Sequence, residues 1–282
     1  MPTRPRSFKQ VDVFTATPLL GNPLAVVLDA EGLSDEQMQA FARWTNLSET
    51  TFVLPPTTAG ADYQVRIFTA VRELPFAGHP TLGTCHAWLE AGGKPQGEEI
   101  IQECGVGLVR VRRQAGQLAF VCPPLLRSGS PTRDELERAC RGLRLDPTQV
   151  VSAEWVDNGA GWLALRLRDR RTVLGLEPDY AALKGLAIGV FAPWDEAVDS
   201  GEAQFEVRAF IADDGMPEDP VTGSLNAGIA QWLYREGLVP DRFVVSQGTV
   251  LGRAGRVYVE RSGKDIWLGG HVSTCIDGQV RL

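Results

Sequence analysis

Apolar residues recur along this chain in short runs with two different spacings, and these spacings predict both strands and helices. Val65-Arg66-Ile67-Phe68 has the composition of a half-buried strand, and a turn rich in proline and glycine follows at 74–80. The next stretch, 81–91, is apolar over most of the circumference of a helix. Helices of this kind lie inside a core, so we predict a central helix wrapped by the sheet of its own half.

The same order of elements recurs in the second part of the chain. Val207-Arg208-Ala209-Phe210 precedes a second turn, and another apolar helical stretch occupies 222–236. Each helix is followed by further strands in the same order. We therefore predict an α+β fold of two halves related by a pseudo-twofold axis, each a mostly antiparallel sheet curled round a central helix. The proline-rich segment 123–131 is the predicted linker, which sets the domains at 1–122 and 123–282.

A separate helix is predicted at 34–44, ahead of the strand that carries the first candidate acid. Ser34 and Gln37 have the spacing of a capping box. Glu49 follows between Ser48 and Thr50, at the start of a β-branched strand, where hydrogen bonds can fix its carboxylate. Taken alone, such an acid is usually a solvated surface residue.

Composition and charge exclude several classes of protein. The chain has 28 Lys and Arg against 35 Asp and Glu, a net charge of −7, which disfavours a nucleic-acid partner. No apolar run is long enough to span a membrane, so no membrane association is predicted. The five cysteines are scattered without a disulfide or metal-binding pattern. These features predict a cytoplasmic protein in a reducing compartment.

Small and hydroxyl-bearing residues stand where each turn meets its central helix, at 78–81 and 220–224. The N–H groups and the positive end of a helix bind carboxylates and other oxyanions well. One alternative is that Thr81 and Thr222 are simply N-caps. Two equivalent junctions favour a shared site for a dianionic or zwitterionic ligand.

These motifs together resemble the phenazine-biosynthesis PhzF-like family, from about Val11 to Val272. The motifs that carry the resemblance are Gly21-Asn22-Pro23-Leu24, Asn46-Leu47-Ser48-Glu49-Thr50, Glu73-Leu74-Pro75-Phe76-Ala77-Gly78-His79-Pro80-Thr81, Glu218-Asp219-Pro220-Val221-Thr222-Gly223-Ser224 and Gln247-Gly248. The resemblance implies the diaminopimelate-epimerase-like fold, with the active site in the cleft between the halves. It also implies that the last residues cross back to the first half.

The resemblance further implies which residues act. The catalytic set falls on Glu49, His79, Asp219 and Ser224. The substrate-binding set falls on Asn22, Gly78, Pro80, Thr222 and Gly223. A carboxylate such as that of Glu49 can take a proton from one carbon and return it to another. The resemblance thus implies an isomerase of a small carboxylate-bearing metabolite that uses no cofactor and no metal and forms a homodimer.

Other functions stay open at this point. Racemases of this fold use one thiol from each half, and neither turn of this chain contains a cysteine. A lyase or hydratase acting on an amino or hydroxy acid would use the same carbon acid. A non-catalytic dimer that binds a small molecule would keep the fold without turnover.

Overall fold

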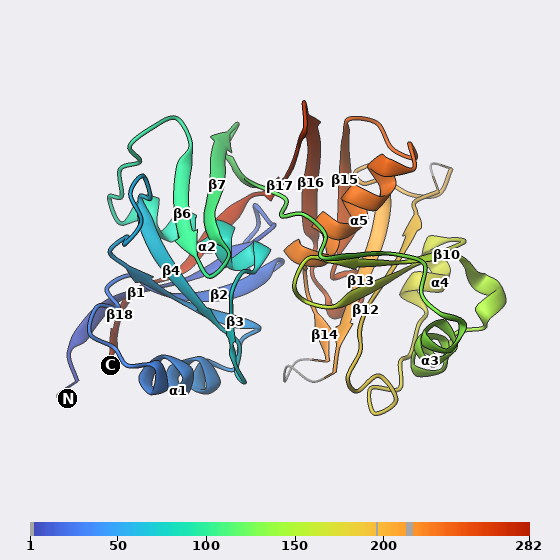
Figure 1. Cartoon of the computed structure of the whole chain (residues 1–282), viewed down its shortest axis with the longest axis horizontal. Coiled ribbons are helices and arrows are strands. Elements are labelled where there is room, and N and C mark those ends of the chain that lie inside the picture. Colours follow the sequence, from blue (N-terminus) through green and yellow to red (C-terminus); the bar gives the residue numbers. More distant parts are fainter. Residues whose placement is uncertain (1–2, 196, 213–216) are drawn as a thin grey trace. The chain divides into compact units, whose positions relative to one another are not determined.

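The computed structural model describes residues 3–195, 197–212 and 217–282, and the chain packs as two compact units (Figure 1). Unit 1 comprises the chain up to Val121 together with Gly269–Leu282, and unit 2 comprises Cys122–Leu268. Each unit combines a mixed, mainly antiparallel sheet with a few helices, so the predicted α+β class is confirmed. No helix in the described part of the chain has both the length and the apolar character that crossing a membrane requires.

The strands of unit 1 form one sheet around α2. Its elements are β1 (Pro5–Val13), β2 (Asn22–Val27), α1 (Asp35–Thr45), β3 (Glu49–Leu54), β4 (Tyr63–Phe68), β5 (Glu73–Leu74), α2 (Gly78–Glu90), β6 (Ile100–Cys104), β7 (Gly107–Gln114), β8 (Gln117–Val121) and β18 (Val272–Arg281). β2 runs parallel to β3 across α1, and β4 runs parallel to β6 across α2. The pairs β1–β2, β3–β4, β4–β5, β6–β7, β7–β8 and β1–β18 are antiparallel.

Unit 2 repeats this strand order. Its elements are β9 (Arg127–Gly129), α3 (Arg133–Leu143), β10 (Val150–Asp157), β11 (Trp162–Leu167), α4 (Arg170–Leu174), β12 (Ala187–Pro193), β13 (Phe205–Ile211), β14 (Glu218–Asp219), α5 (Gly223–Arg235), β15 (Arg242–Gln247), β16 (Gly255–Ser262) and most of β17 (Asp265–Gly270), with short 3₁₀ turns at Pro147–Gln149 and Thr249–Leu251. β11 runs parallel to β12 across α4, and β13 runs parallel to β15 across α5. β1 also pairs with β18 from the far end of the chain, and β10 pairs with the short strand β9 that precedes it.

The two central helices are buried because their small residues let the sheet approach closely. α2 packs against β1, β2, β3 and β8, and α5 packs against β10, β11 and β16. A Cβ at Gly83 of α2 would lie 2.6 Å from the side chain of Leu24, and one at Gly228 of α5 would lie 2.4 Å from the carbonyl oxygen of Val156. Glycine is therefore required at Gly228, where the close atom is backbone, and at Gly83 a larger residue would displace the neighbouring side chains. α2 begins at Gly78, earlier than the predicted 81, because proline is tolerated in the first turn of a helix.

A matching ion pair ties β4 to β5 in unit 1 and β13 to β14 in unit 2. Arg66 contacts Glu73 through Nε and Nη2 at 2.7 and 2.6 Å. Arg208 contacts Glu218 through the same two nitrogens, both at 2.8 Å. Each guanidinium also lies over the phenylalanine two residues further along its strand. The internal duplication indicated by the sequence is thus repeated at the level of side-chain contacts.

The outer helices cover apolar clusters of their own units. The predicted capping box of α1 is confirmed, since Ser34 accepts from the N–H of Gln37 and Gln37 reaches back to Ser34. α1 buries Met38 and Phe41 against unit 1. α3 packs on a second apolar cluster in unit 2 and was not predicted. The predicted linker 123–131 also contains the short strand β9, which pairs with β10.

Candidate active site

Two turns of equal length lead into the central helices. Leu74 ends β5 and Asp219 ends β14. The second residue of each helix, His79 in α2 and Ser224 in α5, lies the same number of residues after the end of the preceding strand. His79 and Ser224 are therefore structural counterparts in units 1 and 2.

In unit 1 the structure brings Glu49 and His79 together. Oε2 of Glu49, the first residue of β3, lies 3.5 Å from Nε2 of His79. The Glu49 side chain is 14% exposed and that of His79 is 3% exposed. Burial lowers the pKa of His79 from 6.5 to about 3. The imidazole is therefore neutral at physiological pH, and the Glu49 carboxylate has a neutral ring beside it instead of a cation.

Asn22 determines which nitrogen of His79 carries the proton. Nδ2 of Asn22, the first residue of β2, lies 3.4 Å from Nδ1 of His79. An amide nitrogen only donates, so Nδ1 accepts and the neutral ring carries its hydrogen on Nε2. That N–H is the one nearest to Glu49. Hydrogen bonds of catalytic groups are commonly longer in the ligand-free site than in the complex.

Threonine hydroxyls lock the start of β3 to the neighbouring helices. Thr45 Oγ1 donates to the carbonyl oxygen of Ala42 at 2.9 Å, so Thr50 Oγ1, at 2.8 Å from it, is the donor of that contact. Thr84 of α2 donates to Thr51 at 2.8 Å. Because the two residues after Glu49 are both held in this way, the backbone that presents its carboxylate is fixed.

In unit 2 the structure brings Asp219 and Thr222 together around Gln247. The Gln247 amide nitrogen donates to the carbonyl oxygen of Asp219 at 3.1 Å and to Thr222 Oγ1 at 2.9 Å. Its oxygen accepts from the Thr222 N–H at 3.0 Å and from Asn226 Nδ2 at 2.8 Å. Because Thr222 Oγ1 accepts from Gln247, its own hydrogen goes to Oδ2 of Asp219, at 2.6 Å. The buried glutamine therefore sets both the shape of the turn and the direction of the Thr222–Asp219 bond.

A similar glutamine supports the turn of unit 1. Gln102 donates to Thr81 Oγ1 at 3.0 Å, and Thr81 donates to the carbonyl oxygen of Ala77 at 2.9 Å. Ala77 is the N-cap of α2, so Thr81 lies inside the helix. Thr222 does occupy the N-cap of α5, but its hydroxyl bonds to Asp219 and makes no capping bond. Neither threonine is therefore a simple N-cap.

The other expected binding residues lie in the first turns of these helices. Gly78 and Gly223 are the first residues of α2 and α5, and Pro80 is the third residue of α2. All three are buried. Neither N-cap residue bonds the first turn through its side chain, so the helix end itself is the feature that an oxyanion would meet there.

The two units do not duplicate their candidate catalytic residues. The pairing of β3 with β2 and β4 in unit 1 has the same register as the pairing of β12 with β11 and β13 in unit 2. This alignment places Ala187 in unit 2 where unit 1 has Glu49. In the turns, Leu74 in unit 1 stands where unit 2 has Asp219. The two units therefore share their strand order, whereas their candidate catalytic residues differ.

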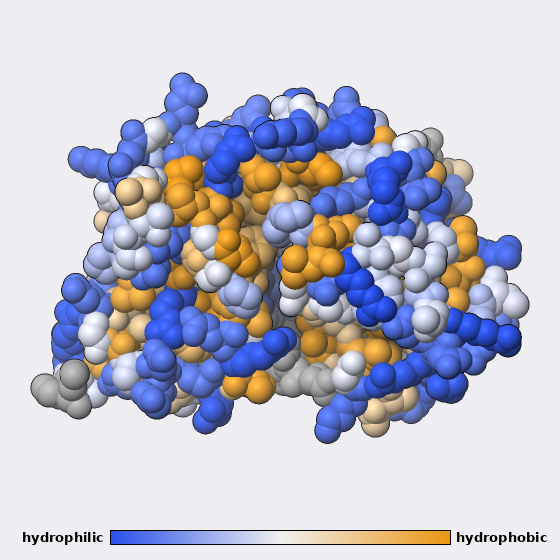
Figure 2. Space-filling view, viewed as in Figure 1, coloured by the Kyte–Doolittle hydropathy of each residue, from blue (hydrophilic) through white to orange (hydrophobic). Residues whose placement is uncertain are grey.

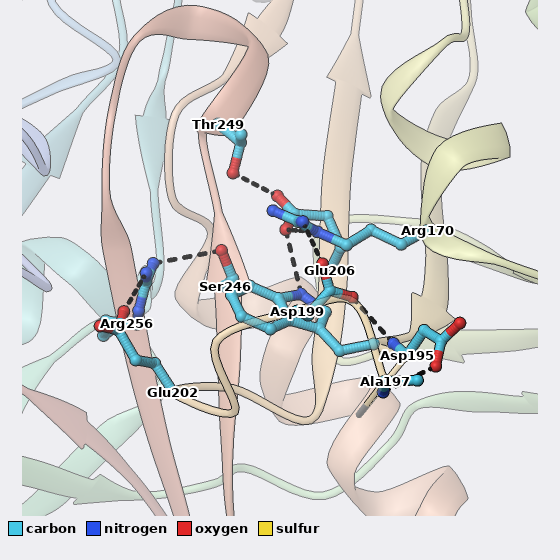
Figure 3. A network of polar contacts seen from close by, with 10 residues as sticks. Arg170, Asp195, Ala197, Asp199, Glu202, Glu206, Ser246, Thr249 and Arg256 are labelled. Atoms are coloured by element: carbon cyan, nitrogen blue, oxygen red, sulfur yellow. Dashed lines mark hydrogen bonds and ion pairs between the residues drawn. The ribbon is translucent and has the colours of Figure 1, made fainter.

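A buried acid fixes the turn that follows Gln247. Glu206 is fully buried in β13 and accepts from Thr249 Oγ1 at 2.6 Å and Arg170 Nε at 3.0 Å (Figure 3). It also accepts from Trp194 Nε1 at 3.2 Å. Glu206, Arg170 and Trp194 were not singled out by sequence. Gln247 lies on the strand that follows the central helix of unit 2, as Gln102 does in unit 1, but by register the counterpart of Gln102 is Val245.

Comparisons with known proteins agree with this fold. The model of the phenazine biosynthesis-like protein family (PhzC-PhzF) matches residues 11–278. The chain is 38% identical to antisense-enhancing sequence 1 of Schizosaccharomyces pombe, over 97% of this chain and 98% of that one. It is 34% identical to trans-2,3-dihydro-3-hydroxyanthranilate isomerase of Pseudomonas aeruginosa, over 90% and 89%. A crystal structure of an Enterococcus faecalis PhzF-family protein superposes with a TM-score of 0.80 at 26% identity, covering 99% of this chain and all of that one.

The fold and these relatives define an isomerase with a diaminopimelate-epimerase-like structure, as the sequence predicted. Within that class, the chain belongs to the phenazine biosynthesis-like protein family.

Proposed function

We propose that this isomerase shifts a proton between carbons of a small carboxylate-bearing metabolite without a cofactor, and that Glu49 is the acid and base. The observation that carries the proposal is the pairing of Glu49 Oε2 with the Nε2 of a buried, neutral His79, 3.5 Å away. A neutral ring at this distance lacks the strong attraction that a cation would exert on the carboxylate. In the proposal this carboxylate takes a proton from carbon.

The proposed reaction uses one carboxyl group twice. The Glu49 carboxylate removes a proton from a carbon next to a carbonyl or a double bond, and holds it as the neutral acid. The electron pair moves along the conjugated system, and the same carboxyl group then returns the proton to another carbon. His79 takes up no second proton during the reaction, because burial disfavours the imidazolium ion.

The division of residues between the units supports a single base. A two-base racemase needs an acid on one face of a carbon and a base on the other. Unit 2 has Ala187 at the counterpart of Glu49, and the counterpart of His79 is Ser224, which is not a base at neutral pH. The carboxylate of unit 2 in this region, Asp219, accepts from Thr222 Oγ1 at 2.6 Å, and we propose for it a role in binding instead of proton transfer. We assign to Asp219 and Ser224 the binding of polar groups of the substrate, together with the helix ends at Gly78 and Gly223.

Solvent exchange tests the proposal directly. Small amino and hydroxy acids would be incubated with the enzyme in deuterated water, beginning with trans-2,3-dihydro-3-hydroxyanthranilate, after which one relative is named. We expect deuterium at carbon with the wild type, because the neutral acid of the 14% exposed Glu49 can exchange its proton with solvent before returning it. We expect a loss of several orders of magnitude with Glu49→Gln, which keeps the size of the side chain but removes the base. Glu98→Gln makes the same chemical change at an exposed position of unit 1 and should exchange normally.

Each other outcome has its own meaning. Equal exchange by the wild type and Glu49→Gln on a true substrate would exclude Glu49 as the base. Release of ammonia or water from that substrate would favour a lyase or hydratase. Tight binding without any exchange would favour a protein that binds a small molecule without converting it.

We also propose a homodimer in the cytoplasm, on the strength of the family resemblance and the composition. All five cysteines are free thiols. Light scattering of the purified protein should give twice the mass of one chain, and fractionation of the source cells should recover the protein in the cytosol. A monomer in light scattering would contradict the first part.

A further inference from the structure

The outer face of α1 carries an exposed tryptophan that is held in place from below. Trp44 is 79% exposed, which is unusual for a side chain of this size and apolar character. Its indole stacks on the ring of Phe41, with ring centroids 5.9 Å apart and an interplanar angle of 18°. Phe41 is itself buried against Phe8 and Phe52. One face of the indole is therefore fixed on the core of unit 1, and the rest of the ring meets solvent.

A groove lies beside this tryptophan. It has a volume of about 390 Å³, and its lining includes Gln37 and Phe41 of α1 and Val280 and Leu282 at the C-terminal end of the chain. Val280 and Leu282 also pack on the apolar cluster beneath α1. In Figure 1, α1 lies outside the sheet of unit 1, near the C-terminus. An exposed aromatic ring next to an apolar groove is typical of the buried centre of a protein interface.

The other side of α1 is tied to unit 1, so the exposed face has a fixed orientation. Nε2 of Gln39 donates to the carbonyl oxygen of Thr69 at 2.9 Å. Arg66 Nη1 donates to Oδ1 of Asp35 at 2.6 Å, and the capping box at Ser34 holds the start of the helix. A partner would therefore meet a preformed surface, which lowers the entropy cost of binding.

Two charges without an ion pair lie on the exposed face of α1. Glu36 is in the first turn and Arg43 in the last turn, and both are exposed. Neither forms an ion pair within the part of the chain that the structure describes. They are separated by about 10 Å along the helix axis. Each is therefore accessible to an opposite charge on another molecule.

The positions of these residues fit a second α1 that runs antiparallel, with a twofold axis at Ala40. At about 100° per residue, Glu36 and Arg43 lie on one side of Ala40, and Gln37 and Trp44 lie on the other. A twofold axis perpendicular to the plane of the two helices reverses their direction but keeps each residue on its own side of the contact. Glu36 of each copy then faces Arg43 of the other, and Trp44 faces Gln37 and the groove behind it. The small side chain of Ala40 lets the helices approach closely at the crossing.

We propose that two copies of this chain associate through α1, with Trp44 of each copy in the groove of the other and Glu36 paired with Arg43 in both directions. The partner is a second copy because this face is complementary to itself in charge and in shape. A partner of uniformly acidic or basic character would match only one of the two charges. The inference rests on the homodimer proposed above and adds the surface that forms it.

The first test measures association by sedimentation velocity over a range of concentrations. Trp44→Ala should raise the dissociation constant of the dimer at least about thirtyfold, as expected for an aromatic side chain at the centre of an interface. Leu126→Ala shortens a side chain in unit 2 that is 75% exposed, and it should leave association unchanged. A dimer that Trp44→Ala does not weaken would overturn the assignment of this surface but not the homodimer. A wild type that stays monomeric would overturn both.

Charge reversal separates pairing between copies from effects within one chain. Glu36→Arg or Arg43→Glu alone should weaken association about tenfold, because like charges then face each other. The two substitutions together should restore most of the association. They also place a positive charge in the first turn of α1 and a negative charge in the last, which is the least favourable arrangement for the helix dipole. Recovery could therefore not come from a more stable helix, and an absence of recovery would overturn the proposed pairing.

Cross-linking locates the twofold axis. Two copies of Ala40 face each other at the crossing, so Ala40→Cys should give a disulfide-linked dimer on mild oxidation. Gln37→Cys is the control, because its own copy lies about 9 Å away along the helix axis, and it should not exceed the background of the wild type, whose five cysteines are free thiols. A failure of Ala40→Cys to cross-link would overturn the geometry. None of these measurements needs turnover, so their outcome does not depend on the role of Glu49.

Discussion

Arg208 and Glu218 form a two-point ion pair in which both side chains are more than nine-tenths buried. The pair joins β13 to β14, and Glu218 immediately precedes Asp219. The remaining guanidinium nitrogen, Nη1, donates to the carbonyl oxygens of Val173 and Leu176 at 3.1 and 2.8 Å. Its counterpart in unit 1, Arg66 with Glu73, has side chains that are 23% and 42% exposed. The same two-point ion pair is therefore buried in unit 2 and partly exposed to solvent in unit 1.

These paired settings give a stability prediction with an internal control. Glu218→Gln leaves a buried guanidinium without its counter-charge and should lower the stability of the fold by about 3–5 kcal/mol. Glu73→Gln makes the same change where water can solvate the arginine, and should cost about 0–1 kcal/mol. Differential scanning calorimetry would measure both. Equal shifts in melting temperature would contradict the prediction.

A second prediction concerns the pH dependence of His79. Burial lowers its pKa from 6.5 to about 3, so the unfolded chain binds a proton more readily than the folded one between these values. Its contribution to stability is therefore complete above pH 6.5 and is lost progressively as the pH falls toward 3. In NMR titrations the ring should stay neutral down to at least pH 5. Titration of His79 near 6.5 would contradict this, and the neutral ring in the proposed mechanism with it.

The loss of stability should also be smaller without this histidine. His79→Gln keeps a polar side chain that does not titrate, so its melting temperature should fall less than that of the wild type between pH 7 and pH 4. Melting curves at a series of pH values would measure the difference. Parallel curves for the two proteins would show that His79 does not contribute to the acid lability.

Glu103 gives a third prediction in a lower pH range. Its carboxylate accepts from the hydroxyl and the N–H of Thr57 and from the hydroxyl and the N–H of Thr58. These bonds, the one from the Thr57 hydroxyl above all, lower the pKa of Glu103 from 4.5 to about 2. The stabilisation is present above pH 4.5 and is lost as the pH falls toward 2. Glu103→Gln should lower the melting temperature at pH 7 and flatten its decline below pH 4.5. Glu98→Gln, at an exposed position of the same unit, should leave both unchanged.

The fourth prediction tests the turn at Asp219. Thr222→Val keeps the shape of the side chain but removes the hydroxyl that donates to Asp219 and accepts from Gln247. A lost hydrogen bond to a charged group should reduce the rate of solvent exchange about tenfold or more. Thr222→Ser keeps the hydroxyl and should retain most of the activity. If both variants exchange equally well, the Thr222–Asp219 bond does not matter for the reaction.

Much of the fold follows from local patterns that the sequence carries openly. The apolar helices 81–91 and 222–236 correspond to α2 and α5, and the capping box at Ser34 is present. Local patterns gave less guidance where pairing is long-range. β9 has no signal within its proline-rich segment, because its partner β10 lies about two dozen residues further along the chain. α3 was missed as well, although Thr132 and Glu135 form a capping box that could have found it.

The sequence by itself determined the duplication, the family and the identity of the candidate groups, because each is a matter of residue type and spacing along the chain. The tertiary structure decided the states of those groups. Burial makes His79 neutral, the amide of Asn22 determines its tautomer, Gln247 directs the Thr222–Asp219 bond, and the strand register makes Ala187 the counterpart of Glu49 in unit 2. Each of these depends on strands and helices that meet only after folding. Protonation and the direction of hydrogen bonds are set by surroundings in space, and the order of residues along the chain does not specify those surroundings one by one.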